Sequence, residues 1–578
     1  MKPKHFLALL AAAVLAGAAV SAWLVLRDRP QDRGADGSGG ATSGPGDGGA
    51  AAFRPAARAP DWAALAPEDA VLLLGTSDLP ALVAELREGP AGKAAAEPSV
   101  KAFLDALAVE RAGPAGEAFA WLELGLDLAG RSDGPAFLAR WRPGGDGDLE
   151  TAVAMRLRSA ELDRVLLLVA DALKAPVAKV RNVPAGAGQV CRTAAPAGRE
   201  GLAWGRCGNW LAVAGSVSGC KRMLDCLARP AGTAPAGALA GALVAAGDGR
   251  LSGCLRLDDD LAGRLPTAAL GWEPAGWLSY SASSGADGRW TERLVLGGRP
   301  AAGGGLLGAL ASGGERPALE GLPATTLACL TANVADGGRF WSELGRALEP
   351  ADPERIVERS AAALAAASNR DFAKDVAPAV RGEVTVAWTL QRQALFPQTL
   401  ICAGLAPGSA AKLADAPAPA LELFGEGGTV ESADYAGSRL SWRQGHAPVA
   451  PFCPSPCAAF QGDRLLVAGS TAPVKELLSG RGQKWLPAGD ARRLGSGLLG
   501  ARVDLGATMP FAMALAGDPE VRDLLPVGAA GKMPKPEELA AHLGALELVA
   551  GRSPAGLWAE VRAPAPLAAL GALLIGDE

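Results

Sequence analysis

The stretch "GNWLAVAGS", Gly208–Ser216, decides the fold, because the chain repeats it as "GDRLLVAGS" at Gly462–Ser470. Each copy is a short apolar run between a glycine and the sequence Ala-Gly-Ser, which is typical of a buried strand. The residues after each copy have helical spacing of their apolar positions. The repeat therefore predicts two copies of one strand-to-helix unit.

Four further pairs of similar stretches occur in the same order along the chain. We interpret the five pairs as a tandem duplication, with a first repeat at 61–320 and a second repeat at 321–578. The further pairs are "LAPEDAVLLLGTSDLPALVAEL" from Leu65 with "LPATTLACLTANVADGGRFWSEL" from Leu322, "GEAFAWLEL" from Gly116 with "GEVTVAWTL" from Gly382, "LRLD" ending at Asp258 with "ARVD" ending at Asp504, and "GRWTERLVL" from Gly288 with "GLWAEVRAP" from Gly556.

Each half alternates short strand-like runs with helical patterns, which predicts the α+β class. Turn signals such as "SASSGADGRW" before Thr291 indicate neighbouring strands joined by short turns, and hence antiparallel pairing. Asp78 and Asp504 each follow a strand and precede a helical pattern, as helix-capping residues do. We therefore expect two tandem α+β halves, with mainly antiparallel sheets covered by helices.

The N-terminal sequence predicts a membrane segment and a linker. Residues 6–26 carry no charge, and about 20 apolar residues suffice to span a bilayer as a helix. We expect residues 1–27 to form an uncleaved anchor; the alternative is a signal peptide cleaved after Ala22. Residues 28–60 are rich in Gly, Ser, Pro and Asp, which predicts a flexible tether. The long C-terminal part is expected outside the cytoplasm, in the periplasm or beyond the cell.

Composition argues against several classes of function. The net charge is -5, and no basic run follows the N-terminus, so a nucleic-acid partner is not expected. The chain has only three histidines, which makes a histidine-based metal site unexpected. We expect no metal and no cofactor.

The sequence "SGCK", Ser218–Lys221, matches the Ser-x-x-Lys pattern of penicillin-recognising serine enzymes. The Lys-Thr-Gly and Ser-Asp-Asn partner motifs of those enzymes do not occur in the chain, and the second copy has Ala472 in place of Ser218. The preferred interpretation is a helix N-terminus followed by a solvated lysine.

Acidic residues at three other places in the chain are interpreted as structural. Asp258–Asp260 are consecutive and cannot all face one cation, so we expect them at a helix N-terminus. Glu117 and Glu383 recur in the paired "GE" stretches and could act as general acids, but no second acid occurs at a matched site. We therefore predict no catalytic residue.

Nine cysteines occur, and the two halves do not share their positions. Disulfide bonds form outside the cytoplasm, so two bridges are candidates. One would join Cys191 and Cys207 across a predicted hairpin, and the other would join Cys453 and Cys457 in the tight loop "CPSPC".

The chain resembles an uncharacterised bacterial family of membrane-anchored envelope proteins. The resemblance rests on "LAPEDAVLLLGTSDLPAL", Leu65–Leu82, and on the strand-to-helix element at 209–228. It implies an N-terminal membrane segment, a tether and repeated α+β units, and it implies no catalytic residues and no substrate.

These observations lead to three hypotheses of function. The first is a non-enzymatic, membrane-anchored envelope protein that acts as a binding or scaffolding module, with an envelope protein or lipid as partner. The second is a carrier of a lipid or another apolar ligand, held in a pocket of the repeats. The third is a hydrolase whose site is not visible in the sequence.

Overall fold

The computed structural model describes residues 56, 58–102, 129–142, 149–158, 181–185, 188–192, 203–230, 237–257, 270–302, 304–348, 362, 370–391, 397–422, 428–444, 455–480, 483–516 and 534–566.

 These described residues hold ten strands from each half of the chain, and all twenty belong to one antiparallel sheet.

The strands of the first half pair in the order β4, β5, β6, β7, β3, β2, β1, β8, β9, β10. Their bounds are β1 (Ala70–Thr76), β2 (Ser132–Trp141), β3 (Glu150–Leu157), β4 (Arg181–Ala185), β5 (Gly188–Arg192), β6 (Ala203–Cys207), β7 (Trp210–Ala214), β8 (Leu251–Arg256), β9 (Trp272–Ser284) and β10 (Trp290–Pro300).

The strands of the second half pair in the matching order β14, β15, β16, β17, β13, β12, β11, β18, β19, β20. Their bounds are β11 (Thr326–Val334), β12 (Val380–Thr389), β13 (Gln398–Leu405), β14 (Thr429–Tyr435), β15 (Ser438–Gln444), β16 (Cys457–Phe460), β17 (Arg464–Ala468), β18 (Leu499–Asp504), β19 (Ala545–Ser553) and β20 (Gly556–Ala563).

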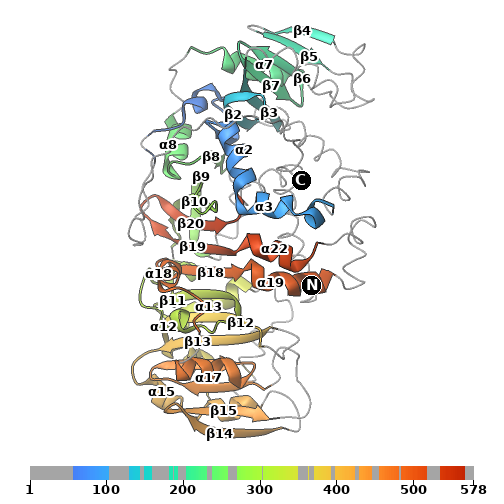
Figure 1. The fold of residues 1–578 in the computed structure, drawn as a ribbon. Helices are drawn as coiled ribbons and strands as arrows, with labels where there is room; N and C mark the ends of the chain where they lie inside the picture. Colours follow the sequence, from blue (N-terminus) through green and yellow to red (C-terminus); the bar gives the residue numbers. More distant parts are fainter. Residues whose placement is uncertain are drawn as a thin grey trace.

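The two halves join where β10 pairs with β20 in an antiparallel ladder, which we call the seam. The strands therefore succeed one another from β4 at one end of the molecule to β14 at the other (Figure 1). The α+β class and the antiparallel pairing are confirmed. The expectation of separate sheets in the two halves is wrong, because the seam makes the sheet continuous.

The quoted repeat forms β7 and β17, and each strand begins after a tight turn. Gly208 and Gly462 adopt left-handed backbone conformations, with φ of 55° and 57°. Glycine tolerates this conformation because it has no Cβ. Each strand then leads into a helix, α7 (Val217–Leu227) or α17 (Thr471–Ser479), as the sequence predicts.

Helices lie on both faces of the sheet. We call the face that carries the side chains of Leu73 and Cys329 the packed face, and the other the open face. On the packed face, α7 and α8 (Gly237–Ala245) contribute to the core of the first half, while α12 (Pro317–Gly321), α17 and α18 (Ala488–Gly495) contribute to that of the second. Alanines on the strands, such as Ala139 and Ala387, are fully buried there and allow close approach of the helices.

On the open face, α2 (Leu79–Glu88) packs against Leu74 and Trp290 in the first half. In the second half, α13 (Gly337–Leu348) packs through Phe340 on Ala332 and Val384. The remaining helical segments are η1 (Asp61–Leu65), α3 (Pro90–Ala96), α11 (Gly305–Gly308), η5 (Phe372–Val376), η6 (Ala377–Ala379), α15 (Ser409–Lys412), α16 (Pro417–Glu422), α19 (Leu505–Ala516) and α22 (Pro536–Leu543).

The predicted helix caps are confirmed at two positions. The Asp78 carboxylate accepts a hydrogen bond from the Ala81 N–H at 3.0 Å, and Asp504 accepts one from the Ala507 N–H at 2.8 Å. Each cap satisfies an amide that the first helical turn leaves free, which is worth about 1 kcal/mol.

One predicted repeat pair is wrong. The stretch from Gly116 lies outside the described residues, and the strand beside β1 that corresponds to β12 is β2 instead. Ala- and Gly-rich stretches resemble one another through their composition alone, which explains the wrong match between these two stretches.

The predicted anchor at residues 1–27 lies outside the described residues, and so does the predicted tether at 28–60 apart from residues 56 and 58–60. Within the described part, no helix has the length and apolar character needed to cross a membrane.

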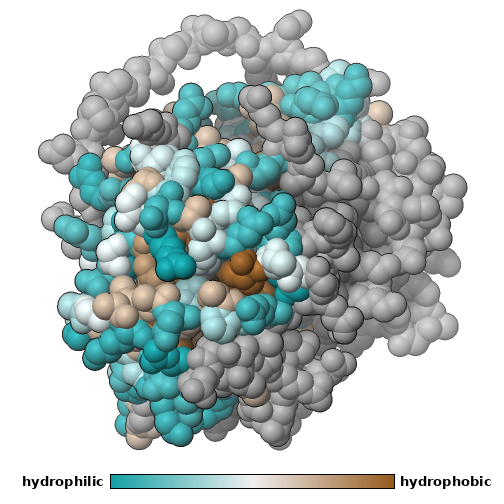
Figure 2. Space-filling view, turned by 90° about the horizontal axis from the view of Figure 1, so that it is seen from below, coloured by the Kyte–Doolittle hydropathy of each residue, from teal (hydrophilic) through white to brown (hydrophobic). Residues whose placement is uncertain are grey.

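The sheet edge at β14 is exposed and acidic, with Glu431 and Asp434 among its exposed residues. The view of the molecule from this end shows mainly hydrophilic residues, with hydrophobic ones between them (Figure 2). Charged side chains on an edge strand discourage pairing with other chains.

Candidate functional site

The strand-to-helix element of the first half brings three polar side chains together. Ser218 donates a hydrogen bond to Glu150 Oε1 at 2.6 Å, and Ser216 donates one to the same oxygen at 2.8 Å. The two hydroxyl oxygens lie 2.9 Å apart. Glu150 is the first residue of β3, and both serines lie at the start of α7.

The chemistry of this cluster is that of a helix N-terminus. Ser216 is buried, and its Oγ accepts a hydrogen bond from the Gly219 N–H at 2.9 Å, which is the geometry of an N-cap. Ser218 and Lys221 are both exposed. The carboxylate of Glu150 accepts from both hydroxyls and holds the cap in place.

The second half keeps the serine at the helix start and its contact with the neighbouring strand, but it lacks the charge and the capping hydrogen bond. Ser470 occupies the capping position of α17 and donates to the side-chain oxygen of Gln398, the first residue of β13. Gln398 corresponds to Glu150, because Glu150 pairs with Trp141 and Gln398 pairs with Thr389 at matching places in the ladders. An amide oxygen accepts a hydrogen bond as a carboxylate does, but it is a far weaker base. The shared feature is therefore a serine at the helix start that donates a hydrogen bond to the first residue of the adjacent strand.

Glu383 is a buried acid with a structural role in the described contacts. Its carboxylate accepts hydrogen bonds from the N–H groups of Ala318 and Leu319, each at 2.8 Å, and from the Thr385 hydroxyl at 2.8 Å. These bonds satisfy the first amides of α12. Burial raises the pKa of Glu383 despite the three donors. Glu117, Asp258, Asp259 and Asp260 lie outside the described residues.

The two predicted disulfide bonds each involve a cysteine whose side chain lies outside the described part, Cys191 in one and Cys453 in the other, so both bonds stay predictions. In the β5–β6 ladder Cys191 lies opposite Trp204, which is three residues from Cys207. Cys191 and Cys207 are therefore not cross-strand neighbours in this register. Cys457 is buried, and its Sγ lies 3.1 Å from the carbonyl oxygen of Ser470.

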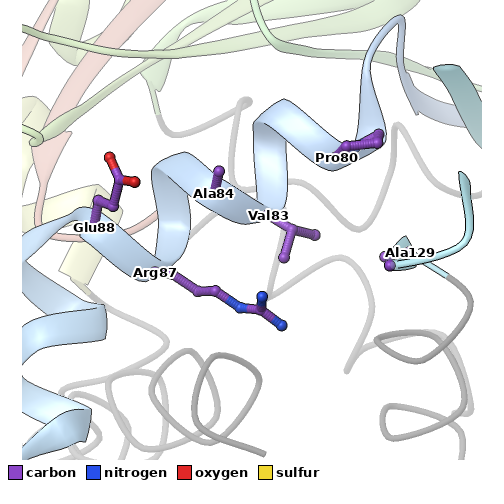
Figure 3. Close-up of a pocket in the computed structure, with 7 residues that line it drawn as sticks. Pro80, Val83, Ala84, Arg87, Glu88 and Ala129 are labelled. Atoms are coloured by element: carbon purple, nitrogen blue, oxygen red, sulfur yellow. The ribbon is translucent and has the colours of Figure 1, made fainter. Parts of the chain in front are cut away.

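A small pocket lies beside α2 (Figure 3). Its volume is about 290 Å³, and its lining combines small apolar side chains with the charged side chains of Arg87 and Glu88. Val83 and Arg87 extend from α2 toward the side where Ala129 lies (Figure 3). A lining of this kind does not favour a carrier of apolar ligands, which needs a mostly apolar cavity.

Three apolar side chains that were not predicted to be functional are exposed on the open face of the second half. Leu330 on β11, Trp388 on β12 and Ile401 on β13 are 40%, 38% and 37% exposed. Leu330 and Ile401 both lie in the row of Val386, which pairs with each of them, and Trp388 follows two residues along β12 on the same face. We call these three residues the apolar patch.

A sequence signal for this patch exists in the strands themselves. The runs "TLACLTANV" at 326–334 and "TLICAGL" at 399–405 are apolar at both odd and even positions. A sheet with one solvated face normally alternates apolar and polar side chains. Continuous apolar runs are therefore typical of strands that are covered on both faces of the sheet.

No group of His, Cys, Asp and Glu side chains suited to a metal ion occurs within the described part of the chain.

Comparison with known proteins gives no relative: no family model, no curated protein and no solved structure matches this chain. The resemblance to bacterial envelope proteins therefore stays a prediction.

Proposed function

We propose that this protein is a non-enzymatic, membrane-anchored envelope protein that binds a second envelope protein through the apolar patch. The observation that carries the proposal is the exposure of Leu330, Trp388 and Ile401 side by side on three adjacent strands. Large apolar side chains gathered on a surface mark interaction sites in soluble domains. The charge-free segment at residues 6–26 supports the anchor and a location outside the cytoplasm.

Tandem duplication is part of the proposal, and the matching strand order of the two halves supports it. The halves differ at the patch. In the first half, Leu74 corresponds to Leu330 and packs in the cluster that includes Leu82 of α2. We infer that the second half has specialised in binding, while the first half serves as its rigid support.

The experiment places a photo-crosslinking amino acid at Trp388 of the full chain in its native cells. The control places it at Arg256, an exposed residue on β8. The proposal expects one discrete protein adduct at position 388, absent at 256 and lost when Leu330 is changed to Asp. Equal adducts at both positions, or no adduct at 388, would contradict it. Adducts with lipid alone would favour the carrier hypothesis instead.

A further inference from the structure

The seam contains a symmetric centre. Seven cross-strand pairs join β10 and β20, from Trp290 opposite Ala563 to Leu296 opposite Leu557. Because the strand order is the same on both sides, each position of β10 has an equivalent position on β20. The registers of the ladders identify these equivalents.

Leu73 and Cys329 are equivalent, because β1 and β11 each have one register irregularity just before them, between Ala70 and Leu72 and between Thr326 and Ala328. From Leu73, successive cross-strand pairings lead to Cys254 on β8, then Ser279 on β9 and then Val295 on β10. From Cys329, the same path leads to Arg502 on β18, then Glu547 on β19 and then Arg562 on β20. Val295 is thus equivalent to Arg562.

Arg293 precedes Val295 by two residues, and Glu560 precedes Arg562 by two residues, so Arg293 and Glu560 are equivalent as well. These two residues also lie directly opposite each other in the seam. Arg293 Nε lies 3.1 Å from Glu560 Oε2, and their side chains are 32% and 27% exposed. A residue at such a centre would face its own copy if β10 paired with β10 or β20 with β20. Those pairings would oppose Arg to Arg or Glu to Glu, and like charges directly opposite destabilise a ladder.

We propose that Arg293 and Glu560 are a specificity pair that directs the first half to the second and disfavours pairing of either strand with the same strand of a second copy of this chain. A half-exposed ion pair adds little to stability by itself. Its effect on the choice of pairing strand is larger, because it favours the β10–β20 pairing and disfavours both the β10–β10 and the β20–β20 pairing. The inference rests on the seam alone and is independent of the proposed function.

The test refolds the full chain in mild detergent at rising protein concentration and measures the monomer fraction by light scattering after size exclusion. The variant R293Q/E560Q removes both charges, and R293E/E560R exchanges them. We expect the neutral variant to form more dimer than the wild type, and the exchanged variant to stay monomeric. At 1 M salt, where the screening length is about 3 Å, the wild type should approach the neutral variant.

A matched control changes Arg299 and Glu273 to Gln, because this pair joins β9 and β10 at 2.7 Å outside the seam. This control should refold to the monomer fraction of the wild type. The proposal is overturned if R293Q/E560Q refolds like the wild type, or if R293E/E560R forms as much dimer as R293Q/E560Q.

Discussion

Trp388 on β12 stands at the position that Arg140 occupies on β2, because each lies opposite the first residue after the register irregularity of its neighbouring strand. The same place in the sheet thus carries a charged side chain in one half and an exposed indole in the other. This difference is the clearest sign that the two halves have separate roles.

Replacing Trp388 by Arg, the residue of the first half, should remove binding without unfolding the protein. The side chain is 38% exposed, so the free energy of unfolding should change by less than about 1 kcal/mol. The measurement combines thermal denaturation with the yield of adducts from a crosslinker at Ile401. Unchanged adduct yield in a folded variant would show that the patch is not the binding surface.

Changing either turn glycine to alanine should destabilise the fold to a similar degree. Gly208 and Gly462 have φ of 55° and 57° with no atom near their would-be Cβ, so the cost is backbone strain of about 1 kcal/mol. Gly345, inside α13, also has open space but an ordinary φ, and its change to alanine should stabilise by about 0.5–1 kcal/mol. Urea denaturation measures the free energy of unfolding of the three variants. A change of the same sign for Gly208→Ala and Gly345→Ala would contradict this prediction.

Changing Glu150 to Gln should have little effect on stability, because the second half already has Gln398 at this place. Changing Ser216 to Ala removes the cap of α7 and should cost about 1 kcal/mol. Denaturation curves of the two variants test this order. A much larger loss for Glu150→Gln would indicate that the carboxylate does more than support the helix.

Changing Glu383 to Gln should destabilise the protein by about 1–3 kcal/mol, because one amide of α12 loses its acceptor. Burial raises the pKa of Glu383 above 4.5, so its ionised form is disfavoured in the folded state. Its contribution is therefore full below pH 4.5 and is lost as the pH rises through the raised pKa. The gap in stability between wild type and variant should narrow over that range. A gap that widens with pH would contradict this prediction.

Cysteine alkylation should proceed in the order of burial. Burial raises the pKa of all three thiols, but Cys207 is only half-buried, whereas the pKa values of the buried Cys254 and Cys329 are raised to about 12. The thiolate is the reactive form, so Cys207 should be modified first in the native protein. Peptide mass spectrometry after brief treatment at pH 8 gives the order, and rapid modification of Cys254 would be inconsistent with the described core.

Local features of the fold could be predicted from the sequence. The glycine turns, the strands β7 and β17 and the caps at Asp78 and Asp504 each depend on a few neighbouring residues. The seam could not be predicted, because it joins residues more than 250 positions apart by backbone hydrogen bonds that any side chain allows.

The site was less predictable than the fold. Ser218 matched a catalytic pattern, yet its contacts with Glu150 are those of a helix start. Trp388 and Ile401 are apolar residues within apolar strands, and such residues are usually interpreted as core. Only the three-dimensional arrangement shows that they remain exposed.

The central claim is that two equivalent halves form one sheet through the β10–β20 seam, and a pair of engineered cysteines tests it most directly. Thr291 lies opposite Arg562, so Thr291→Cys with Arg562→Cys should form a disulfide bond on mild oxidation. Thr291→Cys with Glu560→Cys is displaced by two residues, at roughly 7–8 Å, and should not. Crosslinking of the displaced pair, or of neither pair, would contradict the account.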